Sequence, residues 1–199
     1  MLTLSERVDG YLRYAAAKGY PPALAMAGDW AIGGWVLGNN YQSKQGYHGE
    51  YPPGLLARYA PMFTDKMKVL HLFSGKVDLS VIPGDTCDIN ASLNPTYVAD
   101  AGGTLEDVPI EEYDLVIADP PYSGEDAAKY GTSLVCRNKV LATLGKRLRP
   151  GAHVIWLDQM MPMYSKRVFK QEFLIGVQRS TNHRFRCIVI FRRIAEDEA

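Results

Sequence analysis

The sequence predicts an α/β fold built around a mostly parallel β-sheet. Its central segments are short runs that are apolar throughout, which is typical of strands buried on both faces of a parallel sheet. The C-terminal segments 172–180 and 185–193 are two further runs joined by a tight link, as in an antiparallel hairpin. With 199 residues, 47% of them hydrophobic, the chain is long enough for one domain with a full core. We expect one domain over residues 1–199, in which 1–50 extend a core formed by 51–199.

The N-terminal extension is predicted to begin with a helix. Residues 4–19 have an amphipathic pattern, with Ser5 as the N-cap and Gly19 as the stop. Residues 20–50 are rich in glycine, tyrosine and tryptophan, and no element is assigned to them. The segment 51–63 predicts a short helix that its double proline opens and that closes before its third proline.

Seven strands are expected in the core, five of them before the hairpin. Each of the five runs ends near a polar or acidic residue. The connections between the first three are roughly a dozen residues or fewer, near the lower limit for a parallel crossover, so reduced helices are expected there. One face of the sheet then needs another cover, and the apolar side chains of residues 30–37 either cover it or form a dimer interface. The five runs are 67–73, 84–89, 96–100, 113–118 and 152–158, and a helix at 134–148 lies between the last two.

Composition and charge narrow the classes of function. The formal net charge is zero, so no global basic field marks a nucleic-acid binder, and any such binding needs a local patch. The three cysteines form no CxxC pair and the four histidines show no ligand spacing with them, so neither a metal site nor a disulfide framework is expected. Reduced thiols, no signal-peptide pattern and no run long enough to span a bilayer predict a cytoplasmic protein outside the membrane.

Four groups of polar residues follow consecutive strands of the predicted sheet. They are HLFSG (71–75), Asp88, Asp100 and DPPY (119–122), in that order. Ligands bind outside the carboxyl ends of strands in an open parallel sheet, so the four groups together predict one site. Singly they have ordinary explanations, and Asp100 also suits a helix cap or a turn. The double proline of DPPY stops a sheet ladder and leaves backbone carbonyls free, which folding alone explains poorly.

These motifs resemble those of the AdoMet-dependent amino-methyltransferases of nucleic acids, which methylate N6 of adenine or N4 of cytosine. The resemblance covers roughly residues 50–193, and FSG and DPPY are its specific parts. It implies a Rossmann-like methyltransferase fold with a seven-stranded sheet, and S-adenosyl-L-methionine (AdoMet) as cofactor. Two residues depart from the family pattern: His71 stands where an acid is usual, and Val77 where a second glycine is common.

The resemblance also implies roles for individual residues. Asp88 corresponds to the acid that holds the ribose hydroxyls of AdoMet, and Asp100 to the residue that reads its adenine amino group. The implied catalytic residues are Asp119, Pro120, Pro121 and Tyr122. The implied cofactor-binding residues are Tyr51, Pro52, His71, Leu72, Phe73, Ser74, Gly75, Asp88, Ile89, Asp100, Ala101 and Asp119.

The chemistry explains why such a corner suits methyl transfer to an amine. The exocyclic amine of adenine is a poor nucleophile because its lone pair is delocalised into the ring. The carboxylate of Asp119 and the carbonyl of Pro120 are expected to accept its two N–H bonds and stabilise the developing positive charge. Tyr122 is expected to stack on the base, while the prolines hold these groups in place.

A compact basic link between the last two strands predicts contacts to nucleic acid. If the last strand is antiparallel, this link lies beside DPPY, where its side chains suit phosphates. A solvated turn without a partner is the alternative. The predicted nucleic-acid-binding residues are Ser123, Arg179, Asn182, His183, Arg184 and Arg186.

The leading hypothesis is an N6-adenine DNA methyltransferase without a separate target-recognition domain. N4-cytosine DNA methylation and methylation of an RNA base are the nearest alternatives. An inactive methyltransferase-like subunit that binds nucleic acid is a second class, favoured by His71 and Val77, and a small-molecule methyltransferase is a third, favoured by the zero net charge. Expected partners are DNA and either a second copy of the chain or a separate specificity partner.

Overall fold

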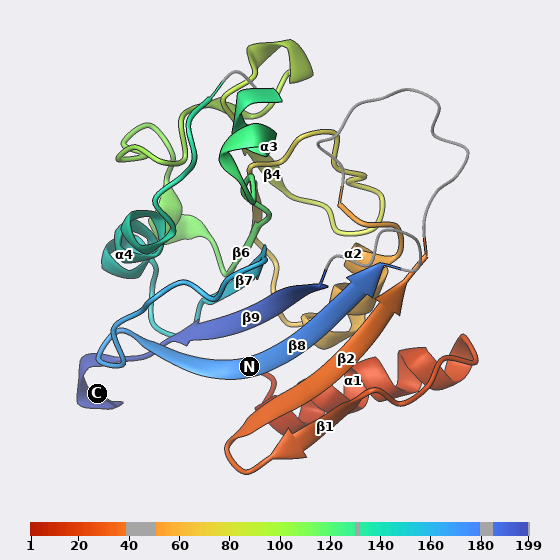
Figure 1. The fold of residues 1–199 in the computed structure, drawn as a ribbon. Helices are drawn as coiled ribbons and strands as arrows, with labels where there is room; N and C mark the ends of the chain where they lie inside the picture. Colours follow the sequence, from red (N-terminus) through yellow and green to blue (C-terminus); the bar gives the residue numbers. More distant parts are fainter. Residues whose placement is uncertain (39–50, 130–131, 180–184, 199) are drawn as a thin grey trace.

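The computed structural model describes residues 1–38, 51–129, 132–179 and 185–198. These residues form a nine-stranded sheet with the order β1-β2-β8-β9-β7-β6-β3-β4-β5 (Figure 1). The strands are β1 (Leu24–Ala27), β2 (Trp30–Leu37), β3 (Val69–Leu72), β4 (Asp85–Asp88), β5 (Tyr97–Val98), β6 (Leu115–Ala118), β7 (His153–Asp158), β8 (Phe169–Arg179) and β9 (Phe185–Arg193). The α-helices are α1 (Leu4–Ala17), α2 (Leu55–Tyr59), α3 (Gly124–Lys129) and α4 (Arg137–Arg147), and the 3₁₀ turns are η1 (Ala60–Met62), η2 (Ala91–Leu93), η3 (Ile110–Glu112) and η4 (Glu196–Glu198).

The predicted α/β fold class is confirmed. Strands β5, β4, β3, β6 and β7 are parallel neighbours, and β9 lies antiparallel between β7 and β8. All seven strands expected from the sequence are present, and β3, β6 and β7 are buried along their whole length. Between β3 and β6 the described chain forms β4, β5 and, in place of α-helices, just the 3₁₀ turns η2 and η3, so the reduced helices expected there are also observed.

The sheet has two strands more than the seven expected. Strands β1 and β2 form an antiparallel hairpin, and β2 then pairs in parallel with β8, with Ala31 opposite Phe173. Glycines interrupt the apolar run of β2 and so conceal the strand from pattern analysis. One of them, Gly33, allows a close approach of backbone, because a Cβ there would lie 2.4 Å from the carbonyl oxygen of Ala23.

The first helix begins earlier than its expected cap. Its N-cap is Thr3, so the prediction of Ser5 in that role is wrong. Thr3 and Glu6 form a capping box: the Thr3 hydroxyl accepts from the Glu6 N–H (3.3 Å), and the Glu6 carboxylate accepts from the Thr3 N–H (2.7 Å). The helix ends before Gly19, whose left-handed φ of 67° agrees with the expected stop.

The helix expected over 51–63 is shorter and starts later. Helix α2 follows Gly54, whose φ is 74°, and the Pro52 carbonyl accepts from the Leu55 N–H (3.0 Å). The double proline therefore belongs to the turn before the helix. The helix closes before Pro61, as expected: α2 ends at Tyr59, and Pro61 lies inside the following turn η1.

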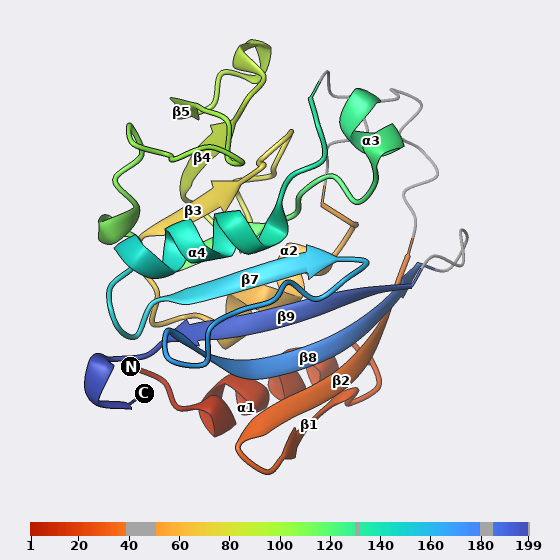
Figure 2. The same ribbon diagram turned by 60° about the vertical axis from the view of Figure 1, so that its left-hand side comes forward.

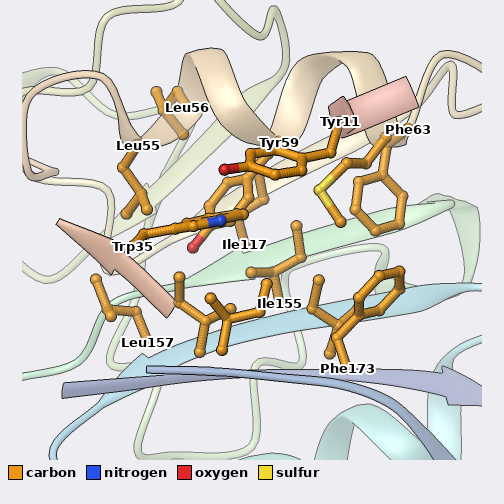
Figure 3. Close-up of a cluster of buried hydrophobic side chains, with 14 of the residues drawn as sticks. Tyr11, Trp35, Leu55, Leu56, Tyr59, Phe63, Ile117, Ile155, Leu157 and Phe173 are labelled. Atoms are coloured by element: carbon orange, nitrogen blue, oxygen red, sulfur yellow. The ribbon is translucent and has the colours of Figure 1, made fainter. Parts of the chain in front are cut away.

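Different parts of the chain cover the two faces of the sheet. Figure 2 shows α4 on one side of the sheet and α1 and α2 on the other. On the side of α1 and α2, buried side chains of α1, β2 and α2 pack together with side chains of the sheet, and we call this group the N-terminal cluster. It includes Trp35, whose ring lies next to those of Tyr11 and Tyr59, with centroid distances of 5.1 and 6.0 Å (Figure 3). These rings pack over side chains of the sheet that include Ile117 and Ile155.

The expected cover by residues 30–37 is confirmed in part. Side chains alternate along β2, so that Trp35 and Leu37 are buried in the N-terminal cluster. Ile32 and Val36 lie on the opposite side of the strand and are exposed. Helices α1 and α2 supply the rest of the cover, which the sequence pattern does not reveal.

A buried arginine fastens α1 to the segment that follows α2. The guanidinium of Arg7 is 1% exposed and donates to the carbonyl of Met62 (2.8 Å) and to both carboxylate oxygens of Asp65 (2.8 and 3.0 Å). It also lies 4.7 Å from the ring centroid of Phe63. Burial alone would raise the pKa of Asp65, but the bonds from Arg7 and from the Leu2 N–H outweigh this and lower it from 3.8 to about 2.

We expect Asp65→Asn to lower the free energy of unfolding by on the order of 3 kcal/mol near neutral pH, because Arg7 is left buried without its counter-charge. Since the pKa of Asp65 is lowered in the folded state, its contribution is present above 3.8 and lost as the pH falls towards 2. Urea unfolding at neutral and at acid pH measures both effects. Glu112→Gln, which breaks the exposed pair with Lys68, is the control and is expected to change the free energy of unfolding much less, because solvent screens an exposed pair. Equal losses in the two variants would contradict the role given to Arg7.

Candidate functional site

The turn after β3 is held against the end of β4. Phe73 and Gly75 have left-handed φ values of 59° and 51°, so the chain turns sharply at the edge of the sheet. The Ser74 N–H donates to the Cys87 carbonyl (3.1 Å), and the Gly75 N–H donates to the Asp88 carboxylate (2.9 Å). These hydrogen bonds join the FSG turn to Cys87 and Asp88, although the two segments are separate in the sequence.

The end of β4 combines a carboxylate with an exposed apolar side chain. The second carboxylate oxygen of Asp88 accepts from the Asn90 N–H (2.9 Å), so backbone bonds fix both oxygens and leave lone pairs for a ligand. Ile89 beside it is 45% exposed. Strand β5 pairs with β4 here, with Val98 opposite Asp88, and leads to Asp100 two residues later.

Asp100 is engaged in a turn of its own. Its carboxylate accepts from the Gly102 N–H (2.8 Å) and its carbonyl accepts from the Gly103 N–H (2.9 Å). The turn-forming explanation considered for this residue is therefore realised, and Ala101 within the turn is buried. A role of Asp100 towards the cofactor stays a prediction.

His71 points into the interior, on the same face of the sheet as the N-terminal cluster. It is fully buried, its Nε2 lies 3.0 Å from the Ile82 carbonyl, and the ring of Tyr51 meets it edge-on at 6.0 Å. Burial lowers the pKa of His71. Val77 packs against the same cluster, so both departures from the family pattern serve packing here.

The segment before α2 reaches the DPPY corner. The hydroxyl of Tyr51 donates to the carbonyl of Ile117 (3.2 Å), two residues before Asp119, and the neighbouring Pro52 is buried. Leu72 at the end of β3 is paired with Ala118 at the end of β6. The FSG turn and the DPPY corner therefore begin side by side.

The DPPY corner contains a hydrogen-bonded pair. The hydroxyl of Tyr122 donates to the carboxylate of Asp119. Pro120 is buried, and its carbonyl accepts no hydrogen bond from the described residues. Burial raises the pKa of Asp119 to about 7, although the bond from Tyr122 and the charge of Arg186 act to lower it.

An ion pair that the sequence analysis did not identify supports this corner. Arg137, at the start of α4, donates through Nε and Nη2 to Asp158 (2.5 and 3.1 Å) and through Nη2 to the carbonyl of Tyr122 (3.1 Å). Asp158 is fully buried and also accepts from the Trp156 indole (3.3 Å). The one sequence signal was that Asp158 closes a strand, like the other acids of the site.

Two of the predicted nucleic-acid-binding arginines lie beside the corner. The guanidinium of Arg186 is 4.3 Å from the ring centroid of Tyr122, and its side chain is 7% exposed. Arg179 ends β8, and Val177, two residues before it, pairs with Arg186. The Nε atoms of both arginines are buried without a hydrogen-bond partner among the described residues.

The remaining residues predicted to bind nucleic acid are placed differently. Ser123 follows Tyr122 directly and is partly buried. Asn182, His183 and Arg184 lie outside the described residues. Within the described ranges, no group of three or more His, Cys, Asp and Glu side chains is arranged to hold a metal ion, and no helix is long and apolar enough to cross a membrane.

Comparison with known proteins finds similarity to solved methyltransferase structures. TrmN from Thermus thermophilus is 16% identical with a TM-score of 0.46, and the match covers 64% of this chain and 44% of that one. The N-methyltransferase NodS from Bradyrhizobium japonicum (12%, TM-score 0.44) is matched over 65% of this chain and 87% of that one. An rRNA methylase from Streptococcus thermophilus (12%, TM-score 0.44) is matched over 66% and 89%. No family model matches the sequence, and no curated protein matches it.

We expect Asp119→Asn to raise the free energy of unfolding, and to do so more at about pH 8 than at about pH 5. The folded carboxyl has a pKa of about 7 against 3.8 for an unperturbed one, so the folded state binds the extra proton and stability falls as the pH rises between these values. The neutral amide removes this penalty and still accepts from Tyr122. Urea unfolding of parent and variant across this pH range measures the difference.

Asp158→Asn serves as the comparison, because it loses the pair with Arg137 and is expected to destabilise the protein over the same pH range. If Asp119→Asn raises the free energy of unfolding by the same amount at about pH 5 and pH 8, the pKa of the Asp119 carboxyl is not raised in the folded state.

Proposed function

We propose that this protein transfers a methyl group from AdoMet to the exocyclic N6 amine of adenine in nucleic acid, with DNA as the expected substrate. The observation that carries the proposal is the corner at the end of β6. There the carboxylate of Asp119 lies next in the chain to the carbonyl of Pro120, which accepts no hydrogen bond from the described residues, and both are beside the turn that follows β3. Two acceptors at the carboxyl edge of a parallel sheet suit an amine substrate.

The ends of β3 and β4 fit a bound AdoMet. Asp88 offers acceptors to ribose hydroxyls, and the exposed Ile89 offers an apolar surface to an adenine ring. The hydroxyl of Ser74 is buried and has no partner among the described residues, so it is a further candidate donor or acceptor. We therefore assign the cofactor to the turn 73–75, Asp88 and Ile89. AdoMet supplies the electrophilic methyl group when bound.

The corner holds the target amine. Asp119 and the Pro120 carbonyl accept its two N–H bonds, which leaves its lone pair free to face the methyl group of a bound AdoMet and stabilises positive charge on nitrogen. The Tyr122 hydroxyl fixes the orientation of Asp119, and Arg137 fixes the backbone of Tyr122. Because these bonds exist before substrate binds, little reorganisation is needed during the reaction.

The alternative of an inactive nucleic-acid-binding relative rests on His71 and Val77. Both side chains are engaged in packing on the face of the N-terminal cluster, which gives them a role that does not require loss of activity. The proposal of an active enzyme is therefore the better supported of the two.

Alternative substrates within the class are the N4 amine of cytosine in DNA and an amine of an RNA base. The arginines beside Tyr122 suit an anionic polymer of either kind. Incubation with AdoMet and with DNA or RNA, followed by digestion to nucleosides and mass spectrometry, tests the proposal. Detection of N6-methyladenosine or its deoxy form supports the proposal. The absence of any methylated nucleoside from both DNA and RNA would overturn it.

We expect Asp88→Ala to weaken AdoMet binding by about 1.5–3 kcal/mol, because the ligand loses charged hydrogen-bond partners and Gly75 loses its anchor. Isothermal titration calorimetry measures the change. Asp85→Ala is a suitable control, since Asp85 lies at the opposite end of the same short strand. If Asp88→Ala binds AdoMet as tightly as the parent, the cofactor has been assigned to the wrong residues.

We expect Asp119→Ala to slow methyl transfer by about a hundred- to a thousandfold and to leave AdoMet affinity nearly unchanged. Because the ionised carboxylate is the acceptor, the parental rate is expected to rise with pH through about 7. Tyr122→Phe keeps the ring but removes a bond that lowers the pKa of Asp119, so its pH profile is expected to shift upward. Single-turnover transfer of a labelled methyl group over a pH series checks both variants, and a parental rate in Asp119→Ala contradicts the assignment.

A further inference from the structure

An exposed aromatic side chain begins strand β9 at the same edge of the sheet as the catalytic corner. Phe185 is 68% exposed, although burial of a phenylalanine side chain is worth about 1.5–3 kcal/mol. Two residues later, Cys187 pairs with Asp158, the last residue of β7. The exposed ring therefore lies at the same edge of the sheet as the corner, within a region where a large exposed apolar side chain can mark an interaction site.

The ring is seated on a glycine. A Cβ built on Gly176 of the neighbouring strand would lie 2.7 Å from Cζ and 3.0 Å from Cε2 of Phe185, so the ring rests directly on the backbone of β8. This contact supports one side of the ring and leaves most of the side chain open to solvent. One side of the Phe185 ring is therefore held in place by the backbone of β8, and the rest of the ring is accessible to a ligand.

The neighbours of Phe185 favour an anionic ligand. Successive side chains of a strand point to opposite faces, so Phe185 and Arg186 lie on the two sides of β9. Arg186 stacks on Tyr122, and its Nε, like that of Arg179, is buried without a partner among the residues described. The end of β9 therefore carries an exposed ring on one face, while Arg179 and Arg186 lie on the other face of the sheet at the same edge. A nucleotide chain that crosses this edge can stack a base on the ring and place phosphates towards the arginines, which suits a nucleic acid better than an uncharged apolar protein surface.

We propose that Phe185 is a stacking platform for an unpaired nucleobase next to the target base. Strand β9 is two positions from β6 in the sheet, about 10 Å at the usual strand spacing, which is within reach of the neighbouring nucleotide. The ligand is a single-stranded or locally opened nucleic acid, because a base within a duplex has no free face for stacking. This inference rests on the proposed function, since it assumes a nucleic-acid substrate.

The test is the binding of fluorescently labelled single-stranded oligonucleotides, measured by anisotropy without AdoMet. Phe185→Ala is expected to weaken binding between about fivefold and a hundredfold, and Phe185→Trp to bind at least as tightly as the parent. The salt dependence of binding is expected to stay unchanged in Phe185→Ala, because no charge is removed. Gly176→Ala, which displaces the ring from its seat, is expected to weaken binding as well.

Val36→Ala is the matched control, because Val36 is similarly exposed and lies opposite Gln178, which in turn pairs with Phe185. Thermal unfolding of all variants checks that the fold is retained. Phe185→Ala binding within twofold of Val36→Ala overturns the proposal. A loss of self-association in Phe185→Ala with unchanged oligonucleotide binding also overturns it, and assigns the residue to a protein interface.

The outcome is separable from that of the methyl-transfer proposal. Oligonucleotide binding that depends on Phe185, in a parent protein that methylates nothing, supports the platform and refutes the enzyme. Methyl transfer that is unaffected by Phe185→Ala supports the enzyme and refutes the platform. A parent protein that binds no oligonucleotide refutes the platform.

Discussion

A parallel sheet whose strands are apolar on both faces has to be covered twice, and this requirement determines how the chain is used. Helix α4 covers one face, but the short connections between β3 and β6 supply no helix for the other. The N-terminal segment takes that place: α1, α2 and Trp35 pack against side chains of β6, β7 and β8. The contacts of Arg7 with Met62 and Asp65 then join the two helical parts of this cover.

Burial stabilises the apolar side chains of the sheet, but at the edge of the sheet it disfavours the charged form of a carboxylate. Asp119 lies where apolar strands end, and its environment opposes ionisation near neutral pH. Asp119 accepts a hydrogen bond from the Tyr122 hydroxyl and feels the positive charge of Arg186, whereas Arg137 forms its ion pair with Asp158. A partly buried carboxylate without an ion pair among the described residues is unfavourable for folding, and such carboxylates are often found where a ligand is bound.

Much of this arrangement is readable from local sequence pattern. The apolar runs and the polar residues that follow them locate the strands and the edge where Asp88 and Asp119 meet the FSG turn. Strand β2 is not readable, because glycines interrupt its run and its partner β8 is remote in sequence. The pair Arg137–Asp158 is hidden for a similar reason, since no local pattern links the start of a helix to the end of a strand. Arg186 is expected at the surface because of its charge, and stacking on Tyr122 explains its burial.

The pairing of β2 with β8 has a consequence for the order in which the protein is made. Ala31 and its partner Phe173 are about 140 residues apart, and β8 reaches the rest of the sheet through β9. A ribosome therefore exposes the apolar hairpin β1–β2 long before the strands that join it to β7 have left the exit tunnel. During this interval the hairpin and the apolar side of α1 lack most of the sheet that they cover in the finished fold, which is the kind of surface that chaperones bind. The strands can pair into the complete sheet only after β8 and β9 have been synthesised. The N-terminal segment is therefore held in the native structure by strands that are made after it.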